Sequence, residues 1–204
     1  MILPYRNALQ GKLQETVVVS TLPLEKGLPE SGLSNLIADA VFWSAKEWAV
    51  TETGRPVPEI CLLNMGGIRT SLPAGVITVS NIYELMPFEN EIVLLQITAS
   101  DMRELFTYVA SKGGAPLAGL RMKIKEALPQ EIFIAGVSYA FDKEVWVATS
   151  DFLASGGDDM HFLTRPLKQF ETKIKVRDAI TEYLRRMHAS GAKLTAEKDG
   201  RITK

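Results

Sequence analysis

Short, continuously apolar runs constrain the fold of this chain more than any other feature. The clearest is Glu91 to Ile97, whose Ile, Val and Leu residues are typical of a strand. Glu59 to Leu63 is a shorter apolar run, which would be fully buried if its sheet is covered on both faces. Further strands are expected within residues 12–22 and at residues 77–79, 120–125, 132–137, 145–149 and 200–203.

Helices are predicted between these strands by apolar residues at three- and four-residue spacing. One should run from about 31 to 48 with Ser31 as its cap, and others are expected at 80–85, from about 99 to 113, and at 172–188. Because strands and helices mix without strict alternation, we expect an α/β (α+β) fold with a mixed sheet packed with helices. Residues 29–204 should form one globular unit, and residues 1–28 an N-terminal appendage that includes the opening strand.

The charge balance and the scarcity of metal ligands exclude several functional classes. The chain has 23 Lys and Arg against 24 Asp and Glu, a formal net charge of -1, so it lacks the basic excess of proteins that bind polymeric nucleic acid. The single cysteine, Cys61, cannot form an internal disulfide or a cysteine-based zinc cluster. The two histidines, His161 and His188, are too few for a binuclear metallohydrolase centre. No apolar run approaches the roughly 20 residues of a membrane span.

Four segments depart from what packing alone would select, and the first is Asn64 to Arg69 (Asn-Met-Gly-Gly-Ile-Arg). The glycine pair, Gly66 and Gly67, permits positive φ values and lets a ligand approach the backbone. Arg69 is suited to holding a phosphate oxygen and Asn64 to bonding a hydroxyl. The alternative interpretation is a tight strand exit with a surface arginine.

The second segment, Pro87 to Asn90, places Phe88 just before a core strand, where its ring either faces outward or packs inward. The third, Asp151 to Asp159, ends in two glycines and two aspartates. A carboxylate there is suited to gripping two sugar hydroxyls, as in dinucleotide folds. The alternatives are solvated turn acidity or a calcium loop, although the spacing does not match a calcium loop. The fourth segment is the helix start at Glu30, where both Glu30 and the mid-helix Asp39 are expected to be structural.

In this order and at these separations, the four segments resemble the C-terminal domain of the 5′-nucleotidase family, which includes UDP-sugar hydrolases and cyclic-phosphodiesterase/nucleotidase enzymes. The family pattern is a Glu before an L-G-N-L-I-A-D-A-like helix, then N-x-G-G-I-R, P-F-x-N and N-F-L-A-x-G-G-D-G. Here these stand as Glu30 with Leu33 to Ala40, Asn64 to Arg69, Pro87 to Asn90 and Asp151 to Asp159. The resemblance covers about residues 16–204.

The resemblance implies a binding site for a nucleoside or nucleotide. In the family two aromatic rings sandwich the base, and Phe88 and Phe152 occupy the matching positions. Asp158 matches the residue that grips the ribose hydroxyls, while Asn64 and Arg69 match residues that hold ribose and phosphate. The implied site residues are Phe88, Phe152, Asp158, Asn64, Arg69, Gly66 and Gly67. Asp151 and Asp159 replace a family asparagine and glycine, and their added negative charge favours a nucleoside over a tightly bound nucleotide.

The resemblance also implies that ester hydrolysis takes place elsewhere. In the family it belongs to an N-terminal metallophosphoesterase domain with two metal ions, and nothing in this sequence resembles that domain. No catalytic residue or metal ligand is therefore assigned to this chain, and divalent metals (zinc, manganese or similar) are expected only in a partner catalytic domain or chain. A periplasmic or cell-surface location, with the signal peptide removed, is implied as well.

The leading hypothesis is therefore a recognition domain of a split 5′-nucleotidase. A stand-alone nucleoside- or nucleotide-binding protein without an enzyme partner is the alternative, and a structural relic with a decayed pocket is a third hypothesis. An autonomous hydrolase using Asp158 and Asp159 is least favoured, because adjacent loop residues do not automatically provide the spacing and pKa separation of an acid/base pair.

Overall fold

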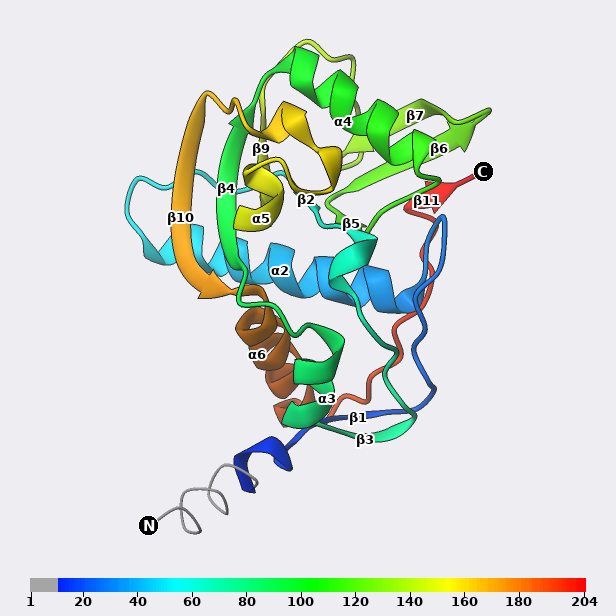
Figure 1. Ribbon diagram of the computed structural model, residues 1–204, viewed down its shortest axis with the longest axis vertical. Coiled ribbons are helices and arrows are strands. Elements are labelled where there is room, and N and C mark those ends of the chain that lie inside the picture. Colours follow the sequence, from blue (N-terminus) through cyan, green and yellow to red (C-terminus); the bar gives the residue numbers. More distant parts are fainter. Residues whose placement is uncertain (1–10) are drawn as a thin grey trace.

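A computed structural model describes residues 11–204 of the chain (Figure 1). Its central layer is a five-stranded sheet with the strand order β10-β4-β9-β2-β5. These strands are β2 (Ile60–Leu62), β4 (Glu91–Ile97), β5 (Leu117–Ala118), β9 (Val145–Ser150) and β10 (Lys168–Lys175). β2 and β9 run parallel and the other neighbouring pairs run antiparallel, which confirms the predicted mixed sheet.

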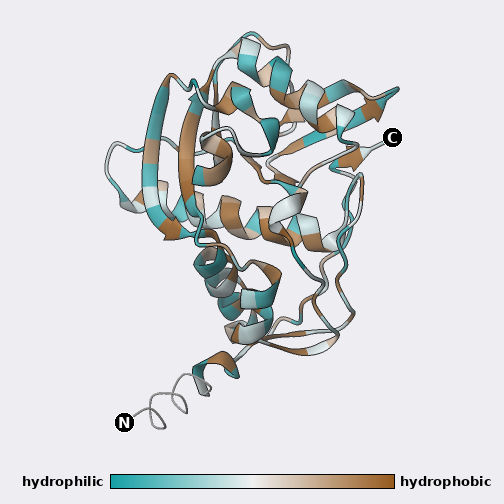
Figure 2. Ribbon diagram, in the orientation of Figure 1, coloured by the Kyte–Doolittle hydropathy of each residue, from teal (hydrophilic) through white to brown (hydrophobic). Residues whose placement is uncertain are grey.

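Both faces of this sheet are covered, as the apolar runs require. In β4, Ile92 and Leu94 belong to one core cluster, whereas Val93 and Leu95 belong to the other. The first cluster includes residues of α2 (Gly32–Thr51) and α6 (Val176–Ala189), and the second includes residues of α4 (Ala99–Ser111). In Figure 2 the central strand β4 is mostly hydrophobic, while the edge strand β10 mixes hydrophilic and hydrophobic residues.

Two smaller sheets and several short elements complete the fold. The four-stranded sheet contains β11 (Ile202–Thr203), β6 (Leu120–Lys125), β7 (Leu128–Ile134) and β8 (Val137–Ser138), and the two-stranded sheet contains β1 (Thr16–Ser20) and β3 (Gly75–Thr78). The short helices are α3 (Val79–Leu85) and α5 (Asp151–Ala154), and single 3-10 turns occur at η1 (Met65–Gly67), η2 (Gly157–Asp159) and η3 (His161–Leu163). None of the helices within residues 11–204 combines the length and apolar character needed to cross a membrane.

The opening strand packs into the core. β1 pairs antiparallel with β3, and Val17 and Val18 are fully buried in the first core cluster. Residues 1–10 of the predicted appendage lie outside the described residues. The boundary between residues 28 and 29 stays a prediction.

Several element boundaries differ from those predicted. The last long helix, α6, begins at Val176 and not at 172, because residues 168–175 form the edge strand β10 beside β4. The predicted strand at 132–137 is shifted, since β7 ends at Ile134 and the chain turns before β8. Ser31 caps α2 as expected, its hydroxyl accepting a hydrogen bond from the Ser34 N–H at 3.1 Å.

The C-terminal residues 194–204 connect distant parts of the molecule. The N–H of Leu194 donates to Val19 in β1, and the guanidinium of Arg201 bonds the Asp39 carboxylate in α2 at 2.7 and 3.0 Å. Ile202 then pairs parallel with Met122 in β6. This C-terminal segment therefore joins the two-stranded sheet, the long helix and the four-stranded sheet.

The topology brings three segments to one edge of the central sheet. Because β2 and β9 are parallel, their carboxyl ends meet at this edge, and because β4 is antiparallel to β9, its amino end meets them there. The segments that follow Leu62, follow Ser150 and precede Glu91 are therefore neighbours in space. These are three of the four segments that the sequence distinguished.

Candidate functional site

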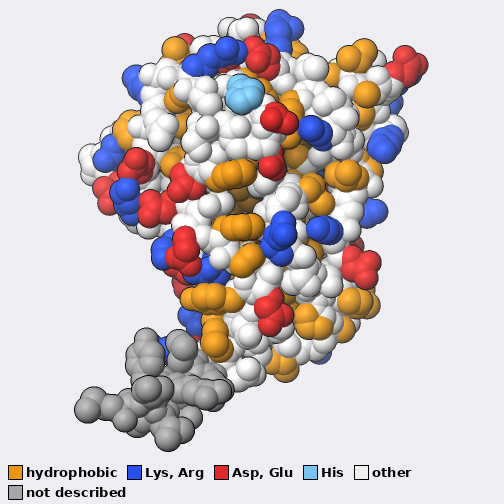
Figure 3. Space-filling model, viewed as in Figure 1, with side chains coloured by type: hydrophobic (Ala, Val, Ile, Leu, Met, Phe, Trp, Pro, Cys, Tyr) orange, Lys and Arg blue, Asp and Glu red, His pale blue; other side chains and the backbone are white. Residues whose placement is uncertain are grey.

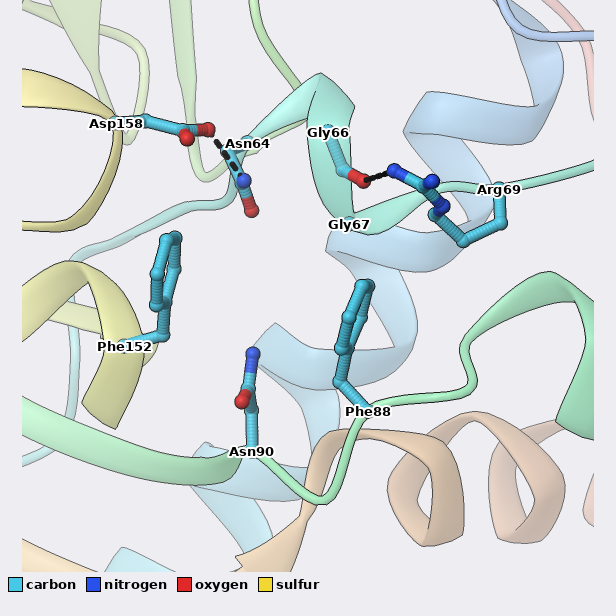
Figure 4. A pocket seen from close by; sticks show the side chains of 8 residues that line it. All are labelled: Asn64, Gly66, Gly67, Arg69, Phe88, Asn90, Phe152 and Asp158. Atoms are coloured by element: carbon cyan, nitrogen blue, oxygen red, sulfur yellow. Dashed lines mark hydrogen bonds between the residues drawn. The ribbon is translucent and has the colours of Figure 1, made fainter.

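A cavity of about 260 Å³ opens where these three segments meet (Figure 4). Its lining residues are Asn64, Gly66, Gly67, Arg69, Phe88, Asn90, Phe152 and Asp158. All seven site residues predicted from the sequence are therefore brought together in one place. Figure 3 shows hydrophobic side chains gathered around the middle of this face of the molecule.

Two phenyl rings form opposite sides of the cavity. Phe88 comes from the loop before β4 and Phe152 from α5, which begins directly after β9. Their exposed fractions are 41% and 42%, so neither ring is sealed in the core and the inward-packing alternative is wrong. Figure 4 shows the rings facing each other across the open space. An aromatic slot of this kind accepts a flat, apolar group whose faces stack on the rings.

Gly157 allows the Phe152 ring to take its position. A Cβ atom at Gly157 would lie 2.4–2.7 Å from three atoms of that ring, so no larger residue fits while the ring stays there. The helix that carries Phe152 is started by Ser150, whose hydroxyl accepts a hydrogen bond from the Leu153 N–H at 3.3 Å. The glycine pair of the acidic segment is thus partly explained by contact with an aromatic ring.

Asn64 and Asp158 meet at a third side of the cavity. The Asn64 carboxamide donates a hydrogen bond to the Asp158 carboxylate, although the two residues lie 94 positions apart in the chain. Cβ atoms at Gly66 and Gly67 would lie 3.2 and 3.1 Å from the Asn64 carboxamide atoms. Neither glycine has a positive φ, so the prediction that this pair provides positive φ values is wrong, while the approach of a ligand to its backbone stays a prediction. What the two positions share is a tight fit against the Asn64 side chain, which a Cβ atom at either glycine would crowd.

The backbone at Asp158 and Asp159 is unusual, with φ values of 53° and 62°. Such left-handed conformations are uncommon for residues other than glycine and occur often at functional sites. Tyr108 of α4 stabilises this turn, because its hydroxyl donates to the Asp158 carbonyl at 2.7 Å. Burial raises the pKa of Tyr108, and the nearby Asp158 and Asp159 carboxylates raise it further, so the hydroxyl keeps its proton.

Arg69 places a positive charge at the side of the slot formed by Phe88. Its guanidinium lies 5.9 Å from the centre of the Phe88 ring, and its Nη1 donates to the Gly66 carbonyl at 3.3 Å. Arg69 is exposed, which leaves it accessible to an anion in solvent.

Two contributing residues were not predicted as site residues. Asn90 lines the cavity, and Figure 4 shows its carboxamide directed into the space between the two rings. It lies within the Pro-Phe-x-Asn segment, so its position next to Phe88 was a usable signal. Tyr108 lies in the last turn of α4, and nothing in its local sequence marks it.

The fourth segment has the structural role that was expected. The buried Glu30 carboxylate accepts hydrogen bonds from the Asn35 carboxamide at 2.6 Å and from the Asp199 N–H at 2.7 Å. Asp39 pairs with Arg201. Within residues 11–204 no group of three or more His, Cys, Asp or Glu side chains is placed to hold a metal ion.

Comparison with known proteins identifies the family. Residues 16–165 match the family described as the 5′-nucleotidase, C-terminal domain. The chain belongs to this family. Its mixed α/β fold is also that of a solved family structure, because a 5′-nucleotidase precursor from Thermus thermophilus superposes with a TM-score of 0.81 at 23% identity, over 99% of this chain and 42% of that one.

The curated relatives are much longer proteins. Endonuclease YhcR of Bacillus subtilis is 27% identical over 155 residues, which cover 74% of this chain and 11% of that protein. A 5′-nucleotidase of Vibrio vulnificus is 25% identical over 141 residues, which cover 67% of this chain and 26% of that protein. This 5′-nucleotidase C-terminal domain therefore spans only a minor part of each.

Proposed function

We propose that this chain is the nucleoside- or nucleotide-recognition part of a 5′-nucleotidase. The observation that carries the proposal is the pair of half-exposed rings, Phe88 and Phe152, on opposite sides of one cavity. A nucleobase is a flat heterocycle with two π-faces, and stacking on aromatic side chains is worth roughly 1–3 kcal/mol per base.

The remaining cavity residues suit the other parts of such a ligand. Asn90 offers a donor and an acceptor to the edge of the base. The Asp158 carboxylate and Asn64 carboxamide, already bonded to each other, are suited to neighbouring sugar hydroxyls. Arg69 is suited to a phosphate beyond the sugar. The Asp158 and Asp159 carboxylates disfavour a strongly anionic ligand, so adenosine, which carries no phosphate, is expected to bind.

Calorimetric titration with adenosine, AMP and UMP tests the recognition role. Phe152→Ala should weaken adenosine binding by roughly tenfold or more, given the stacking energy. Phe133→Ala is the matched control, because this ring is 38% exposed on β7 but does not line the cavity. Unchanged adenosine affinity in Phe152→Ala would contradict the proposal and favour a decayed pocket.

We further propose that ester hydrolysis requires a separate metallophosphoesterase domain or chain. The short share of each relative that this chain spans supports this arrangement. The purified chain should then bind adenosine yet release no phosphate from AMP, with or without zinc or manganese. AMP hydrolysis that survives removal of contaminating enzymes would overturn the division of labour. A stand-alone nucleoside-binding protein is favoured instead if no added metallophosphoesterase partner confers activity.

A periplasmic or cell-surface location belongs to the same proposal. It is supported by the family membership alone. Fractionation of cells that express the natural gene, followed by immunoblotting, tests it. Recovery of the protein only with the cytosolic fraction would refute the location and leave the binding role untouched.

A further inference from the structure

The loop that carries Phe88 is tied to the molecule through the side chain of the next residue, Glu89. The Glu89 carboxylate accepts hydrogen bonds from Lys175 at the end of β10 and from Arg177 in the first turn of α6. These bonds, with that from Lys175 the larger cause, lower the pKa of Glu89 to about 2. The carboxylate therefore stays charged at neutral pH.

This loop has few other attachments. Neither Phe88 nor Glu89 makes a backbone hydrogen bond to another of residues 11–204, and Pro87 has no N–H to donate. The next fixed point is at Asn90, whose carbonyl accepts a hydrogen bond from the Val176 N–H at 2.9 Å. Without the Glu89 side chain, the backbone on either side of Phe88 would be free to move.

Arg177, which bonds Glu89, is itself held in place by a contact with Tyr83. Its side chain is only 5% exposed, and its guanidinium lies 3.9 Å from the centre of the Tyr83 ring in α3. Its Nε has no hydrogen-bond partner within the described residues, and Glu89 supplies the one carboxylate paired with it there. A nearly buried cation depends strongly on such a counter-charge, so Glu89 and Arg177 fix each other's position.

We propose that Arg177 and Lys175 are positioning residues, which act through Glu89 to hold the Phe88 ring facing Phe152 before any ligand arrives. The inference rests on the proposed function, since it concerns affinity for a base. A ring that is already in place loses little conformational freedom on binding, which raises affinity. A change outside the cavity, at Glu89, should therefore affect recognition of the base and not of the sugar.

Glu89→Gln is the variant that tests the inference, because it removes the charge and keeps the shape at a side chain that is 61% exposed. Glu171→Gln is the matched control, since it breaks a similar exposed pair with Lys173 on β10. Adenosine and ribose 5-phosphate are titrated calorimetrically into both. Glu89→Gln should weaken adenosine binding by roughly five- to tenfold and leave ribose 5-phosphate unchanged, while Glu171→Gln changes neither. Equal losses for both ligands, or no loss for adenosine, would overturn the positioning role.

A measurement without ligand separates this inference from the proposed function. Hydrogen exchange of the Val176 amide, which donates to the Asn90 carbonyl of this loop, should be faster in Glu89→Gln than in the wild type or Glu171→Gln. Raising salt to about 1 M should shift wild-type exchange toward that of the variant, because salt screens the exposed pair of Glu89 with Lys175. If the wild type binds neither ligand, the proposed function fails, and the exchange result alone then decides whether Glu89 holds the loop in place. Exchange rates that are the same in all three proteins would refute the role of Glu89 in holding this loop.

Discussion

Replacing Gly157 by alanine tests the aromatic slot while both rings remain in the protein. The new Cβ would lie 2.4–2.7 Å from three atoms of the Phe152 ring, well inside the roughly 3.5–4.0 Å of a normal carbon contact. The φ of Gly157 is not positive, so alanine adds little backbone strain. Because Phe152 is 42% exposed, its ring is free to swing toward solvent. We therefore expect a folded protein with a displaced ring.

The size of the effect follows from the lost stacking. One base–aromatic contact is worth roughly 1–3 kcal/mol, and about 1.4 kcal/mol corresponds to a tenfold change in affinity. The dissociation constant for adenosine should rise roughly 5- to 150-fold, and the melting temperature should change little. Calorimetric titration measures the first quantity and thermal denaturation the second.

Gly27→Ala is the matched control for this experiment. Its new Cβ would meet the Ser31 Cβ at 3.6 Å, an ordinary contact, and it lies outside the cavity. Adenosine affinity should stay at the wild-type value. If Gly157→Ala also binds adenosine like the wild type, then the Phe152 ring does not clasp the ligand, and the slot is not the binding site.

Three further predictions concern other parts of the structure. Tyr108→Phe removes the hydrogen bond to the Asp158 carbonyl, which is worth about 1 kcal/mol, so adenosine affinity measured by calorimetry should fall several-fold. Wild-type affinity in this variant would show that the turn at Asp158 keeps its shape without the bond. Hydrogen bonding from Arg201 lowers the pKa of Asp199 in the folded protein. The stability that the charged Asp199 contributes is therefore present above the ordinary Asp pKa of about 4, and it is lost as pH falls through the lower folded-state pKa. Asp199→Asn should therefore flatten the fall in melting temperature below about pH 4, and a profile that matches the wild type would contradict this coupling. Cys61 is fully buried and burial raises its pKa, so an aromatic disulfide reagent at about pH 8 should label it only after denaturation; rapid labelling of the native protein would be inconsistent with the core.

Patterns that depend on neighbouring residues were predicted well from the sequence. The 3,4 spacing after Ser31 located α2, and the apolar run 91–97 has the bounds of β4. The alternation in β10 was missed because its inward-facing positions are Phe170, Thr172 and Ile174, only two of which are apolar. A hydroxyl bonded to the Ile92 carbonyl takes the middle position, so the strand did not stand out by hydrophobicity.

The site was predictable in its residues but not in its physical causes. Four spaced motifs identified the cavity residues, yet the glycines at 66, 67 and 157 owe their place to where the folded chain puts the side chains of Asn64 and Phe152. The support from Tyr108 and from Arg177 also depends on tertiary contacts. Such contacts follow from strand order, which local patterns do not specify.

The stretch that matches the family ends at residue 165, but the folded unit does not. Beyond that point the chain still supplies the edge strand beside β4, the helix that covers one face, and Arg201, which bonds both Asp39 and the Leu117 carbonyl. A gene trimmed to the matched stretch would therefore encode an exposed sheet edge and an open core, and its product should aggregate when expressed. For this chain, the natural limit of the domain is set by burial and not by similarity.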